Sequence, residues 1–299
     1  MPTGIDDAVP RFYRPRNPAA SPYFKVVTGH FDAFERSYPD LFQARYGFWR
    51  PVIRRAVDKF LKCGDLKEGF ARVRCPDCGH ELFVAYSCRQ RACCPSCGQK
   101  RALMLAQWLS GESLIPSVPH RQWVFTLPKR LRVFFRYDRR LLGRLCRAAY
   151  ETVKGAMTWQ AGEGAVVPGM VAAIQTFGDL VNWHPHIHAL VTEGGFTENG
   201  YFVGIPDIDP KFCLALWQEN VFDLLVREEK IGEDVVRNML GWKHSGFSIN
   251  TSVRLPAGDS TGIRRLAEYM ARTPFSLTRP SSHAPPGPCL SGWCMRWTP

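Results

Sequence analysis

The stretch His184-Pro185-His186-Ile187-His188-Ala189-Leu190-Val191 decides the interpretation of this chain. Its apolar second half predicts a buried strand. Successive side chains of a strand point to opposite faces, so His186 and His188 would share one face while Ile187 packs into the core. Two neutral imidazoles on one rigid strand suit a divalent metal ion. The alternative is a pair of ordinary polar residues on a half-buried strand, and the motif alone names no reaction.

The chain is strongly basic. Its 299 residues include 39 Lys and Arg against 27 Asp and Glu, which gives a formal net charge of +12 at pH 7. This surplus favours a polyanionic partner, most simply nucleic acid, over an enzyme that acts on acidic substrates. The sequence shows no signal peptide and no apolar run of bilayer length, so we expect a cytoplasmic protein with no membrane partner. In a reducing compartment the 11 cysteines are expected to be free thiols or metal ligands rather than disulfides.

One stretch concentrates the positive charge. Between Arg121 and Arg147 there are nine basic residues and one acid, Asp138, and Phe134, Phe135 and Tyr137 lie among them. Such a stretch can neutralise phosphates and stack bases, although a solvated helix face would look similar. The residues that we expect to bind DNA are Arg89, Arg91, Arg101, Lys129, Arg130, Arg132, Arg139 and Arg140.

The hydrophobic pattern predicts an α+β fold in several parts. We expect a flexible, proline-containing arm over residues 1–28, a helical and zinc-binding DNA-binding domain over 29–115, a catalytic domain over 116–280 and an aberrant tail over 281–299. Strand patterns cover 123–128, 171–177, 186–192 and 247–254, and helix patterns cover 141–153, 210–227 and 262–272. Their order favours an antiparallel sheet flanked by helices.

Two CxxC pairs indicate a zinc site. Cys75 and Cys78 are followed after fifteen residues by Cys94 and Cys97, a separation typical of zinc-ribbon-like modules. Four thiolates leave no open coordination position, so this zinc would be structural. The spare donors are Cys88, Cys93 and His80, of which Cys88 is the alternative ligand that we retain. A redox role is less favoured, because nothing around the pairs resembles a βαβ unit.

A tyrosine on the last expected helix adds a candidate nucleophile. Tyr269 shares a helix face with Arg265, four residues before it, and Arg272, three residues after it. A tyrosine in this setting is more often a residue at the edge of a core. Beside a metal-binding strand in a basic chain, however, a phenolate could attack a phosphodiester that a divalent ion polarises and arginines hold.

Several ordered motifs together resemble the rolling-circle transposases of the insertion-sequence-91 type, which belong to the HUH superfamily of single-strand nucleases. The similar segments are 63–64, 69–75, 88–97, 120–128, 175–178, 184–188 and 269–272. The resemblance implies a bacterial, DNA-associated protein with an N-terminal zinc-binding domain and an HUH-type catalytic domain around a central antiparallel sheet. It also implies tyrosine attack on single-stranded DNA or on the hairpin ends of a mobile element, which leaves a 5′-phosphotyrosine and a free 3′-hydroxyl.

The resemblance assigns roles to individual residues. His186 and His188 match the HUH pair that holds Mg²⁺ or Mn²⁺, Gln175 matches a third polar ligand, and His184 competes for that role. Position 273 is Thr where many members carry a second tyrosine, so Tyr269 would be the one nucleophile.

The chain also departs from the family pattern after about residue 280, which gives the expectation of a truncated or frameshifted C-terminus. The competing interpretation is a non-catalytic zinc-dependent DNA-binding protein or an inactive remnant. An ordinary His-x-His metallohydrolase ranks lower, because position 190 is Leu rather than a further ligand.

Overall fold

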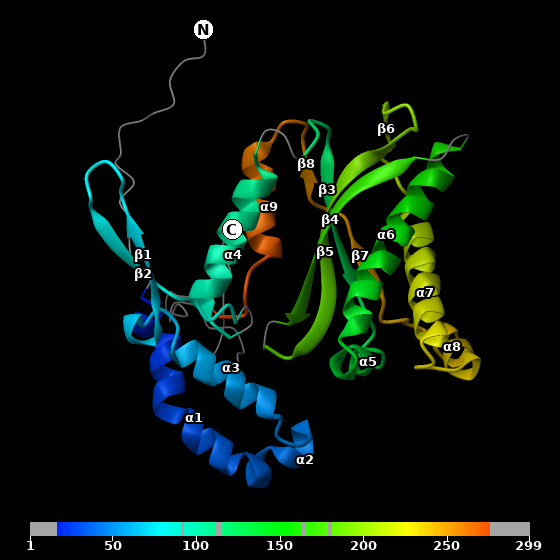
Figure 1. The fold of residues 1–299 in the computed structure, drawn as a ribbon. Helices are drawn as coiled ribbons and strands as arrows, with labels where there is room; N and C mark the ends of the chain where they lie inside the picture. Colours follow the sequence, from blue (N-terminus) through cyan, green and yellow to red (C-terminus); the bar gives the residue numbers. More distant parts are fainter. Residues whose placement is uncertain (1–16, 91–92, 112–114, 163–165, 179–180, 276–299) are drawn as a thin grey trace, which may run out of the picture. The chain divides into compact units, whose positions relative to one another are not determined.

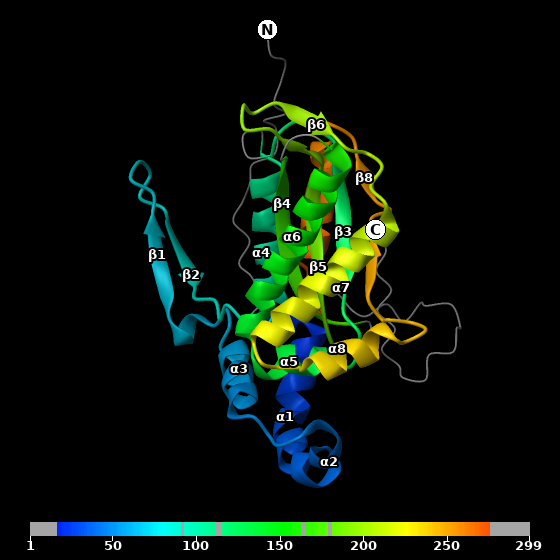
Figure 2. The ribbon, with the colours of Figure 1, turned by 90° about the vertical axis from the view of Figure 1, so that its right-hand side faces the viewer.

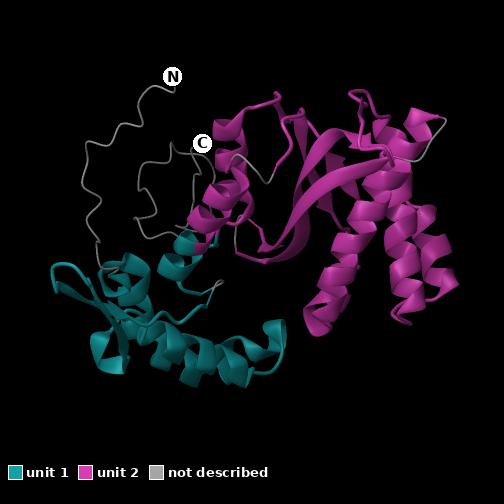
Figure 3. Cartoon of the chain, turned by 45° about the horizontal axis from the view of Figure 1, so that its top comes forward, with its two compact units in different colours: residues 1–100, 273–287, 296–299 teal, residues 101–272, 288–295 magenta. Residues whose placement is uncertain are grey.

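The computed structural model describes residues 17–90, 93–111, 115–162, 166–178 and 181–275, and these form two compact units (Figure 3). Unit 1 contains the described residues up to Lys100 together with 273–275, and unit 2 contains those from Arg101 to Arg272. No helix in the described part of the chain is long and apolar enough to span a membrane.

Unit 1 is helical with one β-hairpin (Figure 1). Its elements are the 3₁₀ turn η1 (Pro18–Ala20), α1 (Pro22–Leu41), α2 (Gln43–Tyr46), α3 (Pro51–Leu61), the 3₁₀ turn η2 (Leu66–Glu68), β1 (Phe70–Arg74), β2 (Glu81–Ala85) and the start of α4 (Pro95–Leu109). Its core is small, and it joins Val27, Val57 and Phe60 to a group of cysteines.

The expected flexible arm is shorter than residues 1–28. Helix α1 already begins at Pro22, because the Ser21 hydroxyl accepts a hydrogen bond from the Phe24 N–H and proline is favourable in the first helical turn. Residues 1–16, the remainder of that arm, lie outside the described residues, as does the expected tail over 281–299.

Unit 2 is built on an antiparallel sheet, which confirms the α+β prediction. The strands are β3 (His120–Thr126), β4 (Val167–Phe177), β5 (Trp183–Phe196), β6 (Phe202–Gly204), β7 (Ser248–Asn250) and β8 (Arg254–Leu255). The main order is β4-β5-β3-β7, with β6 paired to β5 and β8 paired to β3. The long strand β5 therefore lies in the interior of the sheet between β4 and β3.

Helices cover both faces of this sheet. They are α5 (Arg132–Tyr137), α6 (Arg140–Ala161), α7 (Pro210–Arg227), α8 (Glu233–Leu240), α9 (Ser260–Met270) and most of α4. Figure 2 shows α6 and α7 in front of the strands and α4 behind them. The α6–α7 side is the larger core, in which Ile187 packs with Trp123 and Trp217. On the other side Leu190 packs with residues of α4 and α9.

The boundary between the units precedes the one expected at residues 115 and 116. The chain divides at Lys100 and Arg101, inside α4. Ala106 and Leu109 of that helix are buried against Leu266 and Met270 of α9, so most of α4 belongs to the sheet unit. Sequence spacing did not reveal this because the contact joins residues far apart in the chain.

Candidate metal and nucleophile site

Strand β5 directs two histidines toward the α9 side of the sheet. Ile187 faces the α6–α7 core, so the alternation of the strand turns His186 and His188 to the opposite face. Both side chains are buried, and their ring centroids are 4.9 Å apart. Nδ1 of His186 lies 2.8 Å from the carbonyl oxygen of His184, a contact in which Nδ1–H donates and Nε2 keeps a lone pair for a metal.

His188 is held in a neutral state. Burial, followed by the charges of His186 and Arg272, lowers the pKa of His188 to about 3. Its Nδ1 lies 3.1 Å from the side-chain amide of Gln122, and its Nε2 is buried with no hydrogen-bond partner among the described residues. With the amide oxygen of Gln122 turned to accept from Nδ1–H, the Nε2 lone pair becomes available for coordination.

Gln175 joins the strand pair to the tyrosine helix. It lies directly opposite His186 in the β4–β5 register and is 2% exposed. Its Nε2 donates to the carbonyl oxygens of Tyr269 and Met270, at 3.0 and 3.2 Å. Its Oε1 has no hydrogen-bond partner among the described residues. The same amide therefore fastens the C-terminal end of α9 and presents an oxygen beside His186.

The predicted nucleophile lies next to the histidines. Asp259 caps α9 by accepting a hydrogen bond from the Gly262 N–H, and the helix carries Tyr269 to the sheet. The Tyr269 ring meets the His188 ring edge-on with centroids 5.1 Å apart, and its side chain is 39% exposed. The Arg272 guanidinium carbon is 4.1 Å from the centre of the tyrosine ring. The structure therefore brings Tyr269, Arg272 and the histidines together.

Other site residues expected from the sequence are less central. Arg265 is exposed one helical turn before Tyr269. His184 is half-buried, and its ring centroid is 5.0 Å from that of His186. Both candidates for the third ligand are thus adjacent to His186, and each has a buried side-chain atom there, Oε1 of Gln175 and Nε2 of His184. Buried, unpartnered Nε2 and Oε1 atoms beside a second imidazole fit a divalent ion.

The basic stretch divides into surface and structural residues. Lys129, Arg130 and Arg139 are exposed, and Arg130 and Arg139 lie over the rings of Trp242 and Trp183. The other members of the predicted DNA-binding set have different settings. Arg132 donates to the Leu127 carbonyl and is half-buried, Arg140 pairs with Asp138, Arg89 and Arg101 are exposed, and Arg91 lies outside the described residues.

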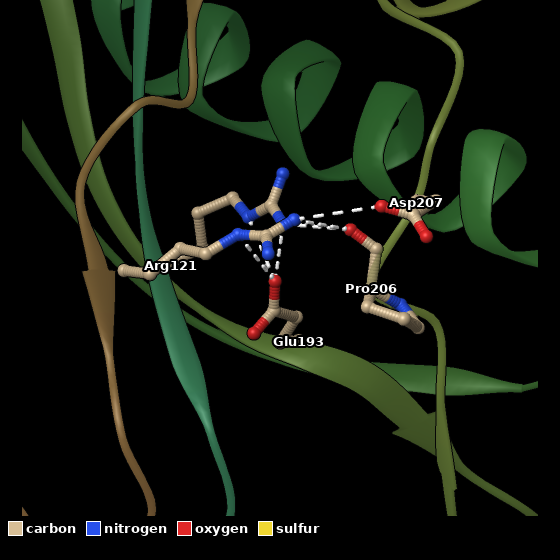
Figure 4. Close-up of polar contacts among 5 residues, drawn as sticks. Arg121, Glu193, Pro206 and Asp207 are labelled. Atoms are coloured by element: carbon tan, nitrogen blue, oxygen red, sulfur yellow. Dashed lines mark hydrogen bonds and ion pairs between the residues drawn. The ribbon is translucent and has the colours of Figure 1, made fainter.

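Arg121, the first residue of the basic stretch, is buried in a charge cluster and is not part of the exposed basic surface. It pairs with Glu193 of β5 and donates to the Pro206 carbonyl, as Figure 4 shows. Arg254 also pairs with Glu193 at 3.1 Å and with Asp207 at 3.6 Å. This cluster ties β3, β5 and β8 together and turns the guanidinium of Arg121 inward.

The zinc ligands also differ from the predicted set. Cys63, Cys88, Cys94 and Cys97 have all four sulfurs within 4.8 Å of one another. Cys94 and Cys97 belong to the predicted set, whereas Cys63 and the alternative ligand Cys88 take the places of Cys75 and Cys78. Cys75 and Cys78 lie instead in the turn between β1 and β2. The hairpin is the physical reason, because five residues of extended strand carry that turn about 16 Å from the base where Cys88 follows β2.

The geometry of the four cysteines suits zinc. Sulfur pairs are 3.6 Å apart for Cys63 and Cys97, 3.6 Å for Cys88 and Cys97, and 3.7 Å for Cys63 and Cys94. A tetrahedral ion with Zn–S bonds of about 2.3 Å places its sulfurs about 3.8 Å apart. Hydrogen bonds from Cys63, Cys88 and Cys94 also lower the pKa of Cys97, which favours a thiolate. The four residues therefore form a closed structural site.

Comparisons with known proteins match two regions of the chain, and each region contains one of the two sites. Residues 33–127 match the family described as "Transposase zinc-binding domain" of the IS91 type, and residues 169–283 match the family described as "Putative transposase". Over these two regions the chain is similar to the insertion-sequence-91 type transposases. The first match contains all four cysteines of the sulfur cluster, and the second contains His186, His188 and Tyr269.

Two curated proteins are also similar. The chain is 35% identical over 157 residues to the "Transposase for insertion sequence element IS801" of Pseudomonas savastanoi pv. phaseolicola, which covers 52% of this chain and 36% of that protein. It is 30% identical over 171 residues to the "Putative transposase y4qJ" of Sinorhizobium fredii, which covers 56% of this chain and 42% of that protein. The matches thus span less than half the length of either relative. No solved structure shows a significant match.

Sequence reasoning missed two residues of these sites. Cys63 was visible only as part of a family-like segment, since it belongs to no CxxC pair. Gln122 lies between Arg121 and Trp123 on β3. The signal that could have found it is the alternation of this strand: Trp123 and Phe125 face the core, so Gln122 faces the side of the histidines.

Proposed function

We propose that this chain is a DNA transposase that cleaves and joins single-stranded DNA through Tyr269, with a 5′-phosphotyrosine intermediate, in rolling-circle transposition. The observation that carries the proposal is the 5.1 Å contact between the rings of Tyr269 and His188. The Tyr269 phenol is half-exposed and lies beside two buried imidazoles and an unused amide oxygen. Phosphoryl transfer to a tyrosine requires such an arrangement, whereas a tyrosine with only a structural role does not.

The reaction would proceed by in-line displacement at phosphorus. The Tyr269 oxygen forms a bond to phosphorus as the bond from phosphorus to the 3′-oxygen breaks, the phenol loses its proton, and the leaving 3′-oxygen gains one. Mg²⁺ or Mn²⁺ held by His186, His188 and Gln175 would supply Lewis-acid polarisation of the non-bridging oxygens. Arg272, over the tyrosine ring, can stabilise the charge that develops on the phosphate.

A basic, aromatic surface supports single-stranded DNA as the substrate. Thr126 pairs with His186 across the sheet, and the chain leaves this end of β3 toward the exposed Lys129 and Arg130. Trp183, three residues before His186, lies under the guanidinium of Arg139. Cations beside partly exposed rings favour a single strand, whose unpaired bases can stack on them, over a duplex whose bases are already stacked.

The direct test is capture of the covalent intermediate. Purified protein is incubated with a hairpin-bearing, labelled single strand and Mn²⁺, and adducts are resolved on a denaturing gel. We expect an adduct in the wild type and none in Tyr269→Phe, which removes only the hydroxyl. Tyr201→Phe, which alters an exposed tyrosine elsewhere in unit 2, is the matched control and should retain the adduct.

Variants of the metal-facing residues separate binding from chemistry. His186→Ala combined with His188→Ala should abolish the adduct while retaining DNA affinity, because the surface cations remain. An adduct in Tyr269→Phe would refute the mechanism. DNA binding by a wild type that forms no adduct with either metal would instead establish the non-catalytic alternative.

A further inference from the structure

The CxxC pair at the tip of the β1–β2 hairpin is not used by the zinc cluster. Cys75 is half-exposed and Cys78 is exposed, and neither belongs to the group of four sulfurs. The two cysteines lie in a hydrogen-bonded turn rather than in an irregular loop. The Cys75 carbonyl accepts from the Gly79 N–H at 3.1 Å, and Gly79 has a φ of 71°, a conformation that favours glycine.

The hydrogen bond from Gly79 closes the turn that contains both cysteines. The backbone N–H groups of Cys78 and Asp77, followed by the side chain of Cys78, lower the pKa of the Cys75 thiol. The turn thus presents two adjacent sulfur donors, which is half of a tetrahedral zinc coordination sphere.

The strand register supplies a third donor. Residues 70–74 pair with residues 85–81, and the Cys75 N–H donates to the His80 carbonyl at 2.8 Å, which continues the same register by one step. Side chains that lie directly opposite each other in an antiparallel pair project from the same face. Cys75 and His80 therefore share a face at the tip, and His80 is exposed, so its imidazole is free to turn toward the sulfurs.

The hairpin also lacks a core that would hold it. All five residues of β1 are exposed, including Phe70 and Val73, and Phe83 of β2 is 48% exposed. An isolated two-stranded hairpin is marginally stable in water. A metal crosslink at the tip would fix the register at the end opposite the base, where exposed ion pairs of Glu81 with Arg72 and Arg74 now join the strands.

We propose that the hairpin tip is a second zinc site, held by Cys75, Cys78 and His80, with the fourth position open to solvent or to an exogenous ligand. It is distinct from the closed cluster of Cys63, Cys88, Cys94 and Cys97 and independent of the proposed DNA cleavage. This zinc has three protein ligands, and they are exposed or half-exposed. It therefore exchanges with zinc in solution more readily than the zinc in the cluster of four cysteines.

Metal stoichiometry of the full chain tests the proposal. Reduced protein is loaded with zinc, freed of excess metal by gel filtration and measured by mass spectrometry. We expect about two zinc per chain in the wild type and about one in Cys75→Ser with Cys78→Ser, since each tetrahedral thiolate site holds one ion. His80→Ala should lose hairpin zinc to a chelator at least about tenfold faster, whereas His30→Ala, at an exposed position of α1, should not.

Cobalt substitution tests the proposal even if the variant Cys75→Ser with Cys78→Ser fails to fold. Titration of the wild type with Co²⁺ should give two phases of sulfur-to-metal charge transfer, and His80→Ala should shift the ligand-field bands of the weaker phase alone. One zinc per chain in the wild type, or two in the double serine variant, would overturn the proposal. Loss of both ions in that variant would also do so, because Cys75 and Cys78 would then serve the first site.

Discussion

At the scale of single residues, neighbours decide which nitrogen of each histidine is available to a metal. The backbone carbonyl of His184 accepts from His186, and the side chain of Gln122 contacts Nδ1 of His188. Both contacts involve Nδ1, so Nε2 is the nitrogen that each ring would offer to a metal. Such outer partners fix the ring orientation and raise the basicity of the ligand nitrogen. Gln122, 8% exposed, is therefore a positioning residue of the proposed metal site.

Replacement of Gln122 should weaken binding of the divalent metal. We expect Gln122→Leu to lower Mn²⁺ affinity by about 10-fold to 100-fold, because the partner of His188 Nδ1 is lost. Gln122→Glu should keep most of the affinity, since a carboxylate accepts from the same Nδ1–H. Titration of zinc-loaded protein with Mn²⁺, followed by electron paramagnetic resonance, measures the effect. Gln107→Leu, at an exposed position of α4, is the control. Equal affinity in Gln122→Leu and wild type would assign Gln122 to packing alone.

At the scale of elements, a largely buried charge cluster links strands β3, β5 and β8 of unit 2. Arg121 of β3 and Glu193 of β5 are 11% and 12% exposed in their side chains, and Arg254 of β8 joins them. Removing one member of a buried ion pair costs about 3–5 kcal/mol, because the remaining charge is left without compensation. Pairs on the surface contribute about 0–1 kcal/mol.

Glu193→Gln should therefore destabilise unit 2 by about 3 kcal/mol, because it leaves two guanidinium groups facing an uncharged amide. Urea unfolding followed by near-ultraviolet circular dichroism gives the free energy of unfolding. The matched control is Glu268→Gln, which removes an exposed partner of Arg264 on α9 and should change stability by less than about 1 kcal/mol. Similar losses in the two variants would show that the cluster is solvated.

The elements themselves were largely predictable from the sequence, because their signals are local. The alternation around Ile187 placed the histidines on one face, and the helix spacing around Tyr269 placed it with Arg272. The zinc ligands were not predictable in full, because the hairpin separates Cys75 and Cys78 from the second CxxC pair. Likewise, burial of Arg121 depends on Glu193, which is distant in sequence and near only across the β3–β5 register.

At the scale of the whole molecule, the net charge of +12 should govern encounter with DNA. Each phosphate neutralised on a single strand contributes about −0.7 to the slope of log affinity against log salt. The combined variant Lys129→Ala, Arg130→Ala and Arg139→Ala should reduce the magnitude of that slope by about 2. Fluorescence anisotropy of a labelled single strand between low and moderate salt measures it. Lys211→Ala, at an exposed position in the first turn of α7, should leave it unchanged. An unchanged slope in the combined variant would remove these three cations from the DNA surface.

The two units should also respond differently to loss of zinc. The core of unit 1 contains only a few buried apolar side chains beside Cys63, Cys94 and Cys97, whereas unit 2 has two hydrophobic clusters of its own. In small metal-binding modules the free energy of zinc binding is a large part of the folding free energy, on the order of 10 kcal/mol. Chelation should therefore unfold unit 1 and leave the sheet folded.

Hydrogen exchange read by mass spectrometry tests this difference along the chain. After zinc removal, or in Cys94→Ser, we expect α1, α3 and the first turn of α4 to lose protection. The later turns of α4 should retain it, because Ala106 and Leu109 pack against α9, and strands β3 to β5 should be unchanged. Cys146→Ser, at a half-buried position of α6, is the control for loss of a thiol that binds no metal. Full protection of α3 without zinc would mean that apolar packing alone holds unit 1, and loss of protection in both units together would mean that their cores fold as one.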